Sequence, residues 1–146
     1  MAFIPAGVYS ISRSGNRLLT FEHGAEKGSP AVLLPPTGQP GIQEWEVRID
    51  SNGNVTIRNL QSQTYLGYEA DPQLNMPVGS YPEPREWALY QSAEPFTFHV
   101  VVPGGPIEGR ELTLDESLLR IYPPRIALRP LDVHDLRQPW RFEFHE

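Results

Sequence analysis

The side chains that could perform chemistry are few and scattered in this chain. They include four histidines, which are His23, His99, His134 and His145. No spacing among them is typical of a zinc site. Asp132 and Asp135 flank His134, but one histidine and two carboxylates on one loop make a weak metal site and no catalytic triad. Since an enzyme needs a nucleophile with a base, or a ligand cluster, we expect no enzyme, no cofactor and no metal.

Charge and composition narrow the classes of partner further. The formal net charge is −6, Lys27 is the single lysine, and the arginines are scattered, so nucleic acid is not an expected partner. The absence of cysteine excludes a disulfide framework and a cysteine nucleophile, and it fits a reducing compartment. The sequence has no charged leader and no run of eighteen apolar residues. We therefore expect a cytoplasmic protein that does not enter a membrane.

The elements that must position any binding residue are short apolar segments in a repeated order. Residues 55–89 contain four of them, at 55–57, 65–68, 76–78 and 86–89, separated by turn-forming residues. The same order occurs upstream at 8–11, 18–21, 31–34 and 45–47, and downstream at 96–100, 111–114, 126–129 and 140–144. Residues 118–122 could form an extra strand or a tucked apolar loop, and the pattern does not decide between them.

A tryptophan marks the fourth segment of each copy. Trp45, Trp87 and Trp140 are separated by 42 and then 53 residues. Sixteen prolines and twelve glycines among short apolar runs, without a helical period, indicate an all-β protein. Three four-stranded copies, at about 5–49, 50–91 and 92–146, predict one monomeric β-trefoil domain with the tryptophans at related, buried positions. A β-sandwich is the main rival, but it would not explain the repeated tryptophan.

Four stretches of the chain resemble the mushroom β-trefoil protease inhibitors. They are Pro-Ala-Gly-Val-Tyr-Ser-Ile at 5–11, Trp-Glu-Val at 45–47, Val-Thr-Ile at 55–57 and Pro-Trp-Arg-Phe at 139–142. The similarity is closest to the cospin-type serine protease inhibitors and more distant to the mycocypins, which inhibit cysteine proteases. The resemblance implies a protein inhibitor of a trypsin-like serine protease, with papain-type and legumain-type cysteine proteases as the alternative targets.

A substrate-like inhibitor needs an exposed, stiff loop, because little conformational entropy is then lost on docking. The best candidate is bracketed by two prolines and consists of Pro72, Gln73, Leu74, Asn75, Met76 and Pro77. We predict that Asn75 enters the primary pocket of the protease and that Met76 follows the scissile bond. The alternative interpretation of Asn75 is a plain turn asparagine.

Other residues could serve instead of Asn75. Arg110, Arg120 and Arg125 lie on predicted loops, and a guanidinium can pair with the carboxylate of a trypsin-like pocket, although each could be a solvated surface charge. The mycocypin resemblance implies Asn59 as the residue used against legumain-type enzymes. It also implies residues 12–17 and 38–43 as the loops used against papain-like enzymes.

A second resemblance concerns the tryptophan motifs. Gln43-Glu44-Trp45 and Gln138-Pro139-Trp140 are similar to the Gln-x-Trp signature of ricin-type lectin repeats, whereas the second copy has arginine at position 85. That family also implies an aspartate early in the repeat and an aromatic platform, and copy one has no aspartate before Asp50. A β-trefoil lectin is therefore an alternative, and we expect no binding to simple sugars.

Overall fold

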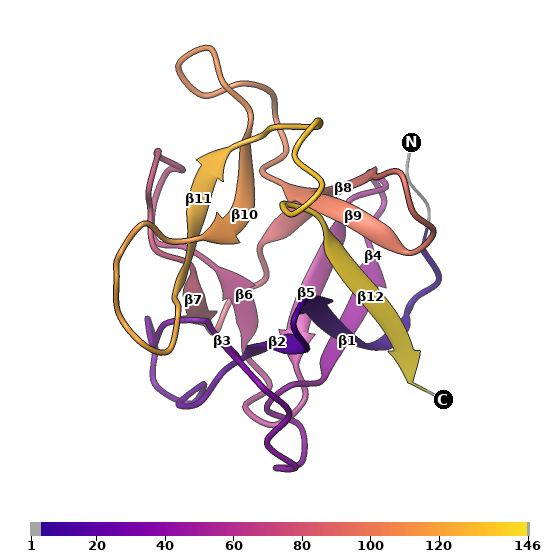
Figure 1. Ribbon diagram of the computed structural model, residues 1–146, viewed down its shortest axis with the longest axis vertical. Helices are drawn as coiled ribbons and strands as arrows, with labels where there is room; N and C mark the ends of the chain where they lie inside the picture. Colours follow the sequence, from indigo (N-terminus) through magenta and orange to yellow (C-terminus); the bar gives the residue numbers. More distant parts are fainter. Residues whose placement is uncertain (1–3, 146) are drawn as a thin grey trace.

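The computed structural model describes residues 4–145, which form twelve strands joined by loops, with no helix (Figure 1). The first repeat contains β1 (Gly7–Arg13), β2 (Arg17–Thr20), β3 (Val32–Leu34) and β4 (Trp45–Ile49). The second contains β5 (Val55–Asn59), β6 (Tyr65–Gly67), β7 (Gly79–Tyr81) and β8 (Glu86–Gln91). The third contains β9 (Thr97–Val101), β10 (Leu112–Glu116), β11 (Ile126–Pro130) and β12 (Trp140–His145).

Six of these strands close a barrel by antiparallel pairing. β1 pairs with β4, β4 with β5, β5 with β8, β8 with β9, β9 with β12, and β12 returns to β1. The other six strands form one hairpin in each repeat: β2–β3, β6–β7 and β10–β11. A closed ring of strands removes the open sheet edges that would otherwise need protection. The chain is a β-trefoil, as the sequence predicted.

The three hairpins meet in a cap whose hydrogen bonds follow the threefold repeat. The N–H of Ala31 donates to Val78 O at 3.0 Å, that of Val78 to Ile126 O at 3.0 Å, and that of Ile126 to Ala31 O at 3.1 Å. All three residues are buried. Because each hairpin supplies a bond to the next, the cap forms only when all three repeats are present.

The three tryptophans occupy equivalent positions in this arrangement. Trp45, Trp87 and Trp140 are each 0% exposed. Each indole Nε1 donates to the main-chain oxygen of a leucine in the second strand of its own repeat, at 3.0, 3.0 and 2.9 Å, namely Leu19, Leu66 and Leu114. These bonds satisfy the only polar atom of each buried ring. The prediction of related, buried tryptophans is confirmed.

One predicted strand lies elsewhere. The apolar segment 76–78 was expected to be the third strand of copy two, but β7 is Gly79–Tyr81 and pairs with β6. Pro77 has no N–H for a hairpin ladder, and the segment pairs with the third repeat instead, through a bridge between Pro77 and Ala127. The apolar residues at 76–78 therefore build the cap between repeats.

Residues 118–122 form neither an extra strand nor a tucked loop. They belong to the connection between β10 and β11, and their apolar side chains are 44–80% exposed. The described residues contain no helix that is long and apolar enough to span a membrane.

Candidate functional site

The threefold symmetry identifies three related positions beside the tryptophans. The leucine that accepts the indole N–H is followed by Thr20 in repeat one, Gly67 in repeat two and Asp115 in repeat three. Two residues before the tryptophans the chain has Gln43, Arg85 and Gln138. These pairs differ in size and charge on a common backbone.

In repeat one the position is filled by neutral hydrogen bonds. Gln43 Nε2 donates to Thr20 Oγ1 at 3.0 Å and to Pro35 O at 3.0 Å, and Gln43 Oε1 accepts from Thr37 N at 3.1 Å. Gln43 is buried, so its bonds anchor the loop between β3 and β4. This side of the first repeat is closed.

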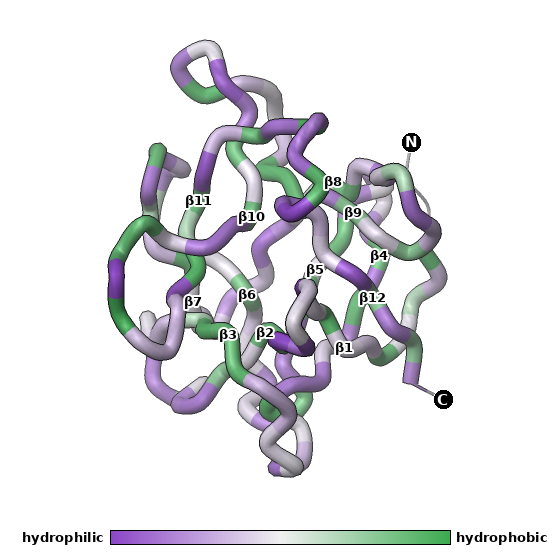
Figure 2. Tube along the Cα trace, in the orientation of Figure 1, coloured by the Kyte–Doolittle hydropathy of each residue, from purple (hydrophilic) through white to green (hydrophobic). Residues whose placement is uncertain are grey.

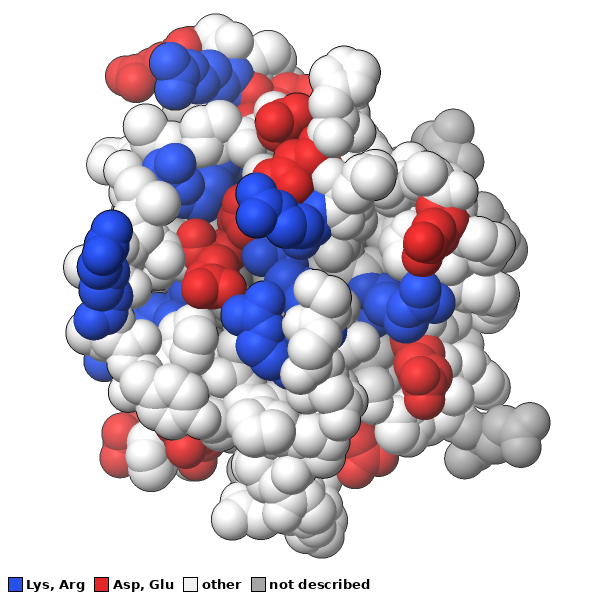
Figure 3. Space-filling model, viewed as in Figure 1, with Lys and Arg blue, Asp and Glu red and all other residues white. Residues whose placement is uncertain are grey.

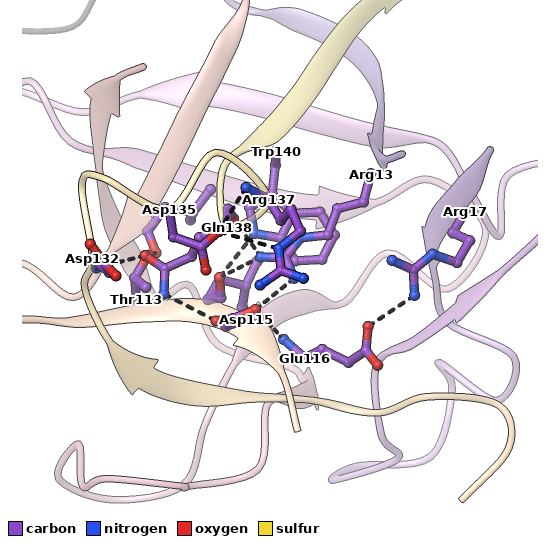
Figure 4. Close-up of polar contacts among 12 residues, drawn as sticks. Arg13, Arg17, Thr113, Asp115, Glu116, Asp132, Asp135, Arg137, Gln138 and Trp140 are labelled. Carbon is purple, nitrogen blue, oxygen red and sulfur yellow. Dashed lines mark hydrogen bonds and ion pairs between the residues drawn. The ribbon is translucent and has the colours of Figure 1, made fainter. Parts of the chain in front are cut away.

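In repeat three the position is filled by a buried ion pair (Figure 4). Arg13 Nη1 lies 2.6 Å from Asp115 Oδ1, and the two side chains are 5% and 23% exposed. Gln138 Nε2 donates to Asp115 Oδ2 at 3.0 Å, and Arg13 Nη2 donates to Gln138 O. The Arg13 guanidinium also lies 4.0 Å from the centre of the Trp140 ring. Both carboxylate oxygens of Asp115 are therefore engaged by the protein itself.

The aromatic neighbours of the tryptophans differ in the same way. Phe21 packs edge-on against Trp45 with ring centres 4.7 Å apart, and Tyr68 packs against Trp87 at 5.6 Å. The third repeat has Glu116 at the related place, and the Arg13 guanidinium covers the Trp140 ring instead. Burial lowers the pKa of Arg13, and the negative charge of Asp115 opposes this shift.

In repeat two no polar network forms at this position, and a pocket lies beside it. Gly67 has no side chain and is covered by Arg85, whose Cβ would lie 3.3 Å from an added Cβ and whose guanidinium carbon lies 4.0 Å from the centre of the Tyr68 ring. Arg85 Nη2 donates to the main-chain oxygens of Tyr68 at 2.6 Å and Ala70 at 3.1 Å. The connection from β7 to β8 is also short, at residues 82–85. A pocket of about 830 Å³ results.

The pocket has aromatic, acidic and basic walls. The residues that line it are Lys27, Asn54, Gly67, Tyr68, Glu69, Ala70, Pro72, Tyr81, Pro82, Glu83, Pro84, Arg85, Glu86, Val102, Pro103 and Gly104. Tyr81 is half-buried, whereas Glu69 and Glu83 are exposed. A concave site with an aromatic wall and several polar groups is the usual form of a small-molecule site.

The charges in this pocket act on its tyrosines. Burial raises the pKa of Tyr81, the carboxylate of Glu69 raises it further, and Arg85 opposes both. Burial also raises the pKa of Tyr68, against the effect of Arg85. The Tyr81 hydroxyl therefore stays protonated at neutral pH and available as a hydrogen-bond donor.

Figure 3 shows basic and acidic side chains next to one another on the face in view, so the charges there are mixed.

The predicted reactive residue Asn75 has a structural role in the cap. Its N–H donates to Leu128 O at 2.8 Å, its side-chain oxygen accepts a hydrogen bond from Arg129, and its φ is +66°. In the first repeat Gly28, with a φ of +81°, donates to Ser80 O at 2.7 Å in the same way. Asparagine adopts the left-handed region more readily than most residues, which accounts for its place here. Its entry into a protease pocket stays a prediction.

Asn75 is exposed, and the other residues of that loop differ in exposure. Gln73, Leu74 and Pro77 are exposed, while Pro72 and Met76 are half-buried. Pro72 also lines the pocket of repeat two. The structure thus brings one end of the predicted loop to the pocket.

Asn59 is buried and has a structural role, and its use against legumain-type enzymes stays a prediction. It is 0% exposed, its Nδ2 donates to Ile42 O at 3.1 Å, and its Oδ1 accepts from the main-chain N–H groups of Gln61 and Ser62, each at 3.2 Å. These bonds hold the turn that follows β5. Its side chain can reach a protease only if this turn opens.

The three candidate arginines are exposed but lie in different surroundings. Arg110 closes a tight turn by exchanging two main-chain hydrogen bonds with Ile107. Arg125 O accepts from Ser117 N at 2.7 Å, next to the start of β11. Arg120 lies between them in sequence, in the middle of the connection from β10 to β11.

The two loops implied for papain-like enzymes are partly structural. Residues 12–17 carry Arg13 and Arg17, and the latter pairs with Glu116 at 2.9 Å. Residues 38–43 end in the buried stretch Gly41 to Gln43. Within residues 4–145 no three side chains of histidine, aspartate or glutamate gather in a way that could hold a metal ion.

The pocket residues could not be predicted from sequence motifs, because no signature covers them. The only sequence signal for the pocket was Arg85, which replaces the glutamine of the Gln-x-Trp motif, together with the two tyrosines Tyr68 and Tyr81 in the second copy. That replacement marks the repeat where the filling glutamine is absent.

Comparison with known proteins supports the fold at low sequence identity. No protein-family model matches the sequence, and no curated protein matches it, so the resemblance to cospin-type inhibitors has no support at the sequence level. Among solved structures, the Rhizoctonia solani agglutinin is similar with a TM-score of 0.80 and 19% identity, covering 99% of both chains. The Macrolepiota procera ricin B-like lectin, solved with lactose, has a TM-score of 0.78 and 19% identity, covering 99% of this chain and 100% of the lectin.

A designed threefold-symmetric protein, ThreeFoil, is similar with a TM-score of 0.76 and 16% identity, covering 95% of this chain and 99% of the design. At these identities the likeness establishes the β-trefoil fold and not the activity.

Proposed function

We propose that the protein binds carbohydrate without catalysing a reaction, and that the sugar binds in the pocket of repeat two. The observation that carries the proposal is the wall of this pocket, where Tyr81, Glu69, Glu83 and Arg85 face one space of about 830 Å³. Carboxylates, which accept hydrogen bonds, and a guanidinium, which donates them, occur there beside an aromatic ring.

The chemistry of a pyranose fits this set of side chains. A pyranose has an apolar face of C–H groups, which packs on an aromatic ring such as that of Tyr81. Its hydroxyls act as both donors and acceptors, so carboxylates accept from them and a guanidinium donates to them. The names of two similar structures, an agglutinin and a lectin with lactose, support the same class of ligand.

This proposal replaces the expectation that simple sugars do not bind. That expectation rested on the missing aspartate and aromatic platform of a ricin-type repeat. Repeat two has Gly67 where an aspartate occurs in repeat three, but Glu69 and Glu83 bring carboxylates to the pocket from later positions. Tyr81 supplies the aromatic ring.

A glycan array with the purified protein tests the proposal. We expect a signal that free sugar competes, and we expect Tyr81→Ala to weaken binding at least about tenfold, which corresponds to about 1.4 kcal/mol. Tyr122→Ala is the matched control, because Tyr122 is 80% exposed and lies outside the pocket. The absence of sugar-competed binding to any glycan would contradict the proposal.

Inhibition of a trypsin-like serine protease is our second proposal. The resemblance to mushroom inhibitors motivates it, and one observation favours it: exposed arginines lie on loops outside the pocket. Inhibition constants against trypsin, chymotrypsin, papain and legumain test it. Inhibition of trypsin at nanomolar to micromolar concentration supports the proposal, and no inhibition of any of the four enzymes contradicts it.

A further inference from the structure

We infer that the bond presented to a trypsin-like protease is Arg120–Ile121, in the connection of residues 117–125 between β10 and β11. The inference rests on the second proposed function and names its contact site. It places that site away from the predicted loop at 72–77.

The connection projects from the body of the protein and offers its side chains to solvent. It is the loop at the left edge of Figure 1, and Figure 2 shows it as two apolar stretches on either side of a hydrophilic one. Leu118, Leu119, Ile121 and Tyr122 are 69%, 59%, 44% and 80% exposed, and Arg120 is exposed between them. An arginine flanked by accessible apolar side chains suits a deep acidic pocket with apolar borders.

The main chain of Arg120 forms no main-chain hydrogen bond in the part of the chain that the structure describes, whereas the main chains of the other candidates do. A protease holds its substrate as an added strand and binds the carbonyl oxygen of the reactive residue in its oxyanion hole. Arg110 uses both its N–H and its carbonyl with Ile107, Arg125 O accepts from Ser117, and Asn75 N–H donates to Leu128. Among the described residues, Arg120 N–H and O have no main-chain partner.

The backbone conformation also separates Arg120 from Asn75. A substrate strand is extended, so its residues have negative φ. Asn75 has a φ of +66°, whereas no residue of 117–125 has a positive φ within the described chain. Asn75 must therefore leave the left-handed region to lie extended in an active site, whereas no residue of 117–125 must do so.

Both ends of the connection are fixed close to the reactive bond. Ser117 N–H donates to Arg125 O at 2.7 Å, which closes the loop at its base. On the far side Pro124 O accepts from Leu33 N at 2.9 Å, and Pro123 and Pro124 restrict the backbone. On the near side Leu119 N–H donates to Ser117 Oγ at 3.2 Å.

These anchors explain how a cleavable bond can inhibit. The protease serine attacks the Arg120 carbonyl carbon, the C–N bond to Ile121 breaks, and the serine proton passes through the protease histidine to the Ile121 nitrogen. An acyl-enzyme and a new amino terminus result. Because the anchors keep that amine near the ester, it can attack again and re-form the peptide bond before water hydrolyses the ester.

The side chain of Arg120 is available for a pocket carboxylate. Four of the ion pairs in the structure involve other arginines of the surface, namely Arg17, Arg48, Arg137 and Arg141. Within residues 4–145 the guanidinium of Arg120 forms no ion pair. No existing interaction must therefore break when it enters the protease.

Trypsin inhibition by four forms of the full chain tests the inference. We expect the unaltered protein to inhibit, Arg120→Ala to lose at least 100-fold in the inhibition constant, and Arg120→Lys to retain most of the inhibition. Arg110→Ala is the matched control, since Arg110 is an exposed arginine on another loop, and it should stay within about twofold. Mass spectrometry after long incubation should detect cleavage between Arg120 and Ile121.

Each other outcome has a definite meaning. Inhibition that Arg120→Ala leaves unchanged overturns the inference but not the second proposed function, and Asn75→Ala then identifies or excludes the loop at 72–77. Rapid cleavage after Arg120 without inhibition overturns the inference, because the loop is then an ordinary substrate. No trypsin inhibition by the unaltered protein overturns both. Thermal unfolding of each variant confirms that the fold is retained.

Discussion

The second and third repeats carry two versions of the same place in the fold, one open and one closed. In repeat three, Asp115 and Gln138 are joined by Arg13 from the first repeat, and the space beside Trp140 is filled. In repeat two, Gly67 and Arg85 stand at these positions and a pocket of about 830 Å³ remains. The tryptophans make the same hydrogen bond in both repeats.

This difference separates what the fold requires from what a binding site requires. The tryptophans and leucines are needed for the barrel, so all three repeats keep them. The residues next to them are free to vary, because either a polar network or an open pocket is compatible with the same backbone. We therefore propose that repeat three contributes stability and that repeat two contributes binding.

The largest expected effect is on the closed site. Arg13→Met removes the partner of Asp115 and leaves a carboxylate that is largely buried, so we expect the free energy of unfolding to fall by about 3 kcal/mol. Chemical denaturation monitored by tryptophan fluorescence measures this change.

Two further variants sharpen this test. Arg17→Ala removes an ion pair whose side chains are 37% and 39% exposed, and it should change stability by less than about 0.5 kcal/mol. The double change Arg13→Met with Asp115→Leu removes both charges and should recover most of the loss. Equal stability of Arg13→Met and the unaltered protein would show that the closed site has no stabilising role.

A smaller effect is expected when the open site is given the residue of the closed one. In Gly67→Asp the added Cβ lies 3.3 Å from Arg85 Cβ, a tight contact that a small shift of the arginine relieves, and we expect the new carboxylate to pair with that arginine. We expect sugar affinity to fall about tenfold or more, while the fold is kept. Isothermal titration calorimetry with a sugar identified on the array measures the change, and unaltered affinity would place the ligand elsewhere.

The smallest expected effect is a pH dependence of stability, which we attribute to His99 in repeat three. Burial lowers the pKa of His99 from 6.5, Arg13 lowers it further, and Asp115, Asp132 and Asp135 oppose the shift. The folded protein therefore holds the neutral imidazole, and the unfolded chain takes up a proton first as pH falls. Stability should be full above about pH 6.5 and decline below it.

Denaturation between pH 7.5 and 5 checks this dependence. His99→Gln should reduce its slope in that range, whereas His134→Gln, at an exposed position, should leave it unchanged. Identical slopes for the unaltered protein and His99→Gln would exclude His99 as the source.

Much of the fold could be predicted from the sequence because it depends on repeated local patterns. The three tryptophans and the alternating apolar strands recur, and they identified the β-trefoil. The third strand of repeat two was missed because Met76 and Val78 are apolar for contacts with another repeat, whereas Gly79 and Ser80, which form the strand, have weak strand propensity. Contacts between repeats produce no recognisable pattern in the local sequence.

The candidate site was harder to predict for the same reason. The chain brings Lys27, Asn54, Tyr81 and Pro103 to one pocket from four loops or strand ends, and no spacing in the sequence relates them. The role of Asn75 was also hidden, because its equivalent in repeat one is a glycine and only the shared hydrogen bond relates the two.

An NMR titration is the sharpest test of our proposal that sugar binds in the pocket of repeat two. The ¹⁵N-labelled protein would be titrated with a panel of soluble mono- and disaccharides that includes lactose. We expect saturable shifts concentrated in the amides of residues 67–70, 81, 83, 85 and 86, with none around Asp115 and Gln138. Shifts confined to repeat three, or no saturable shift with any sugar of the panel, would contradict it.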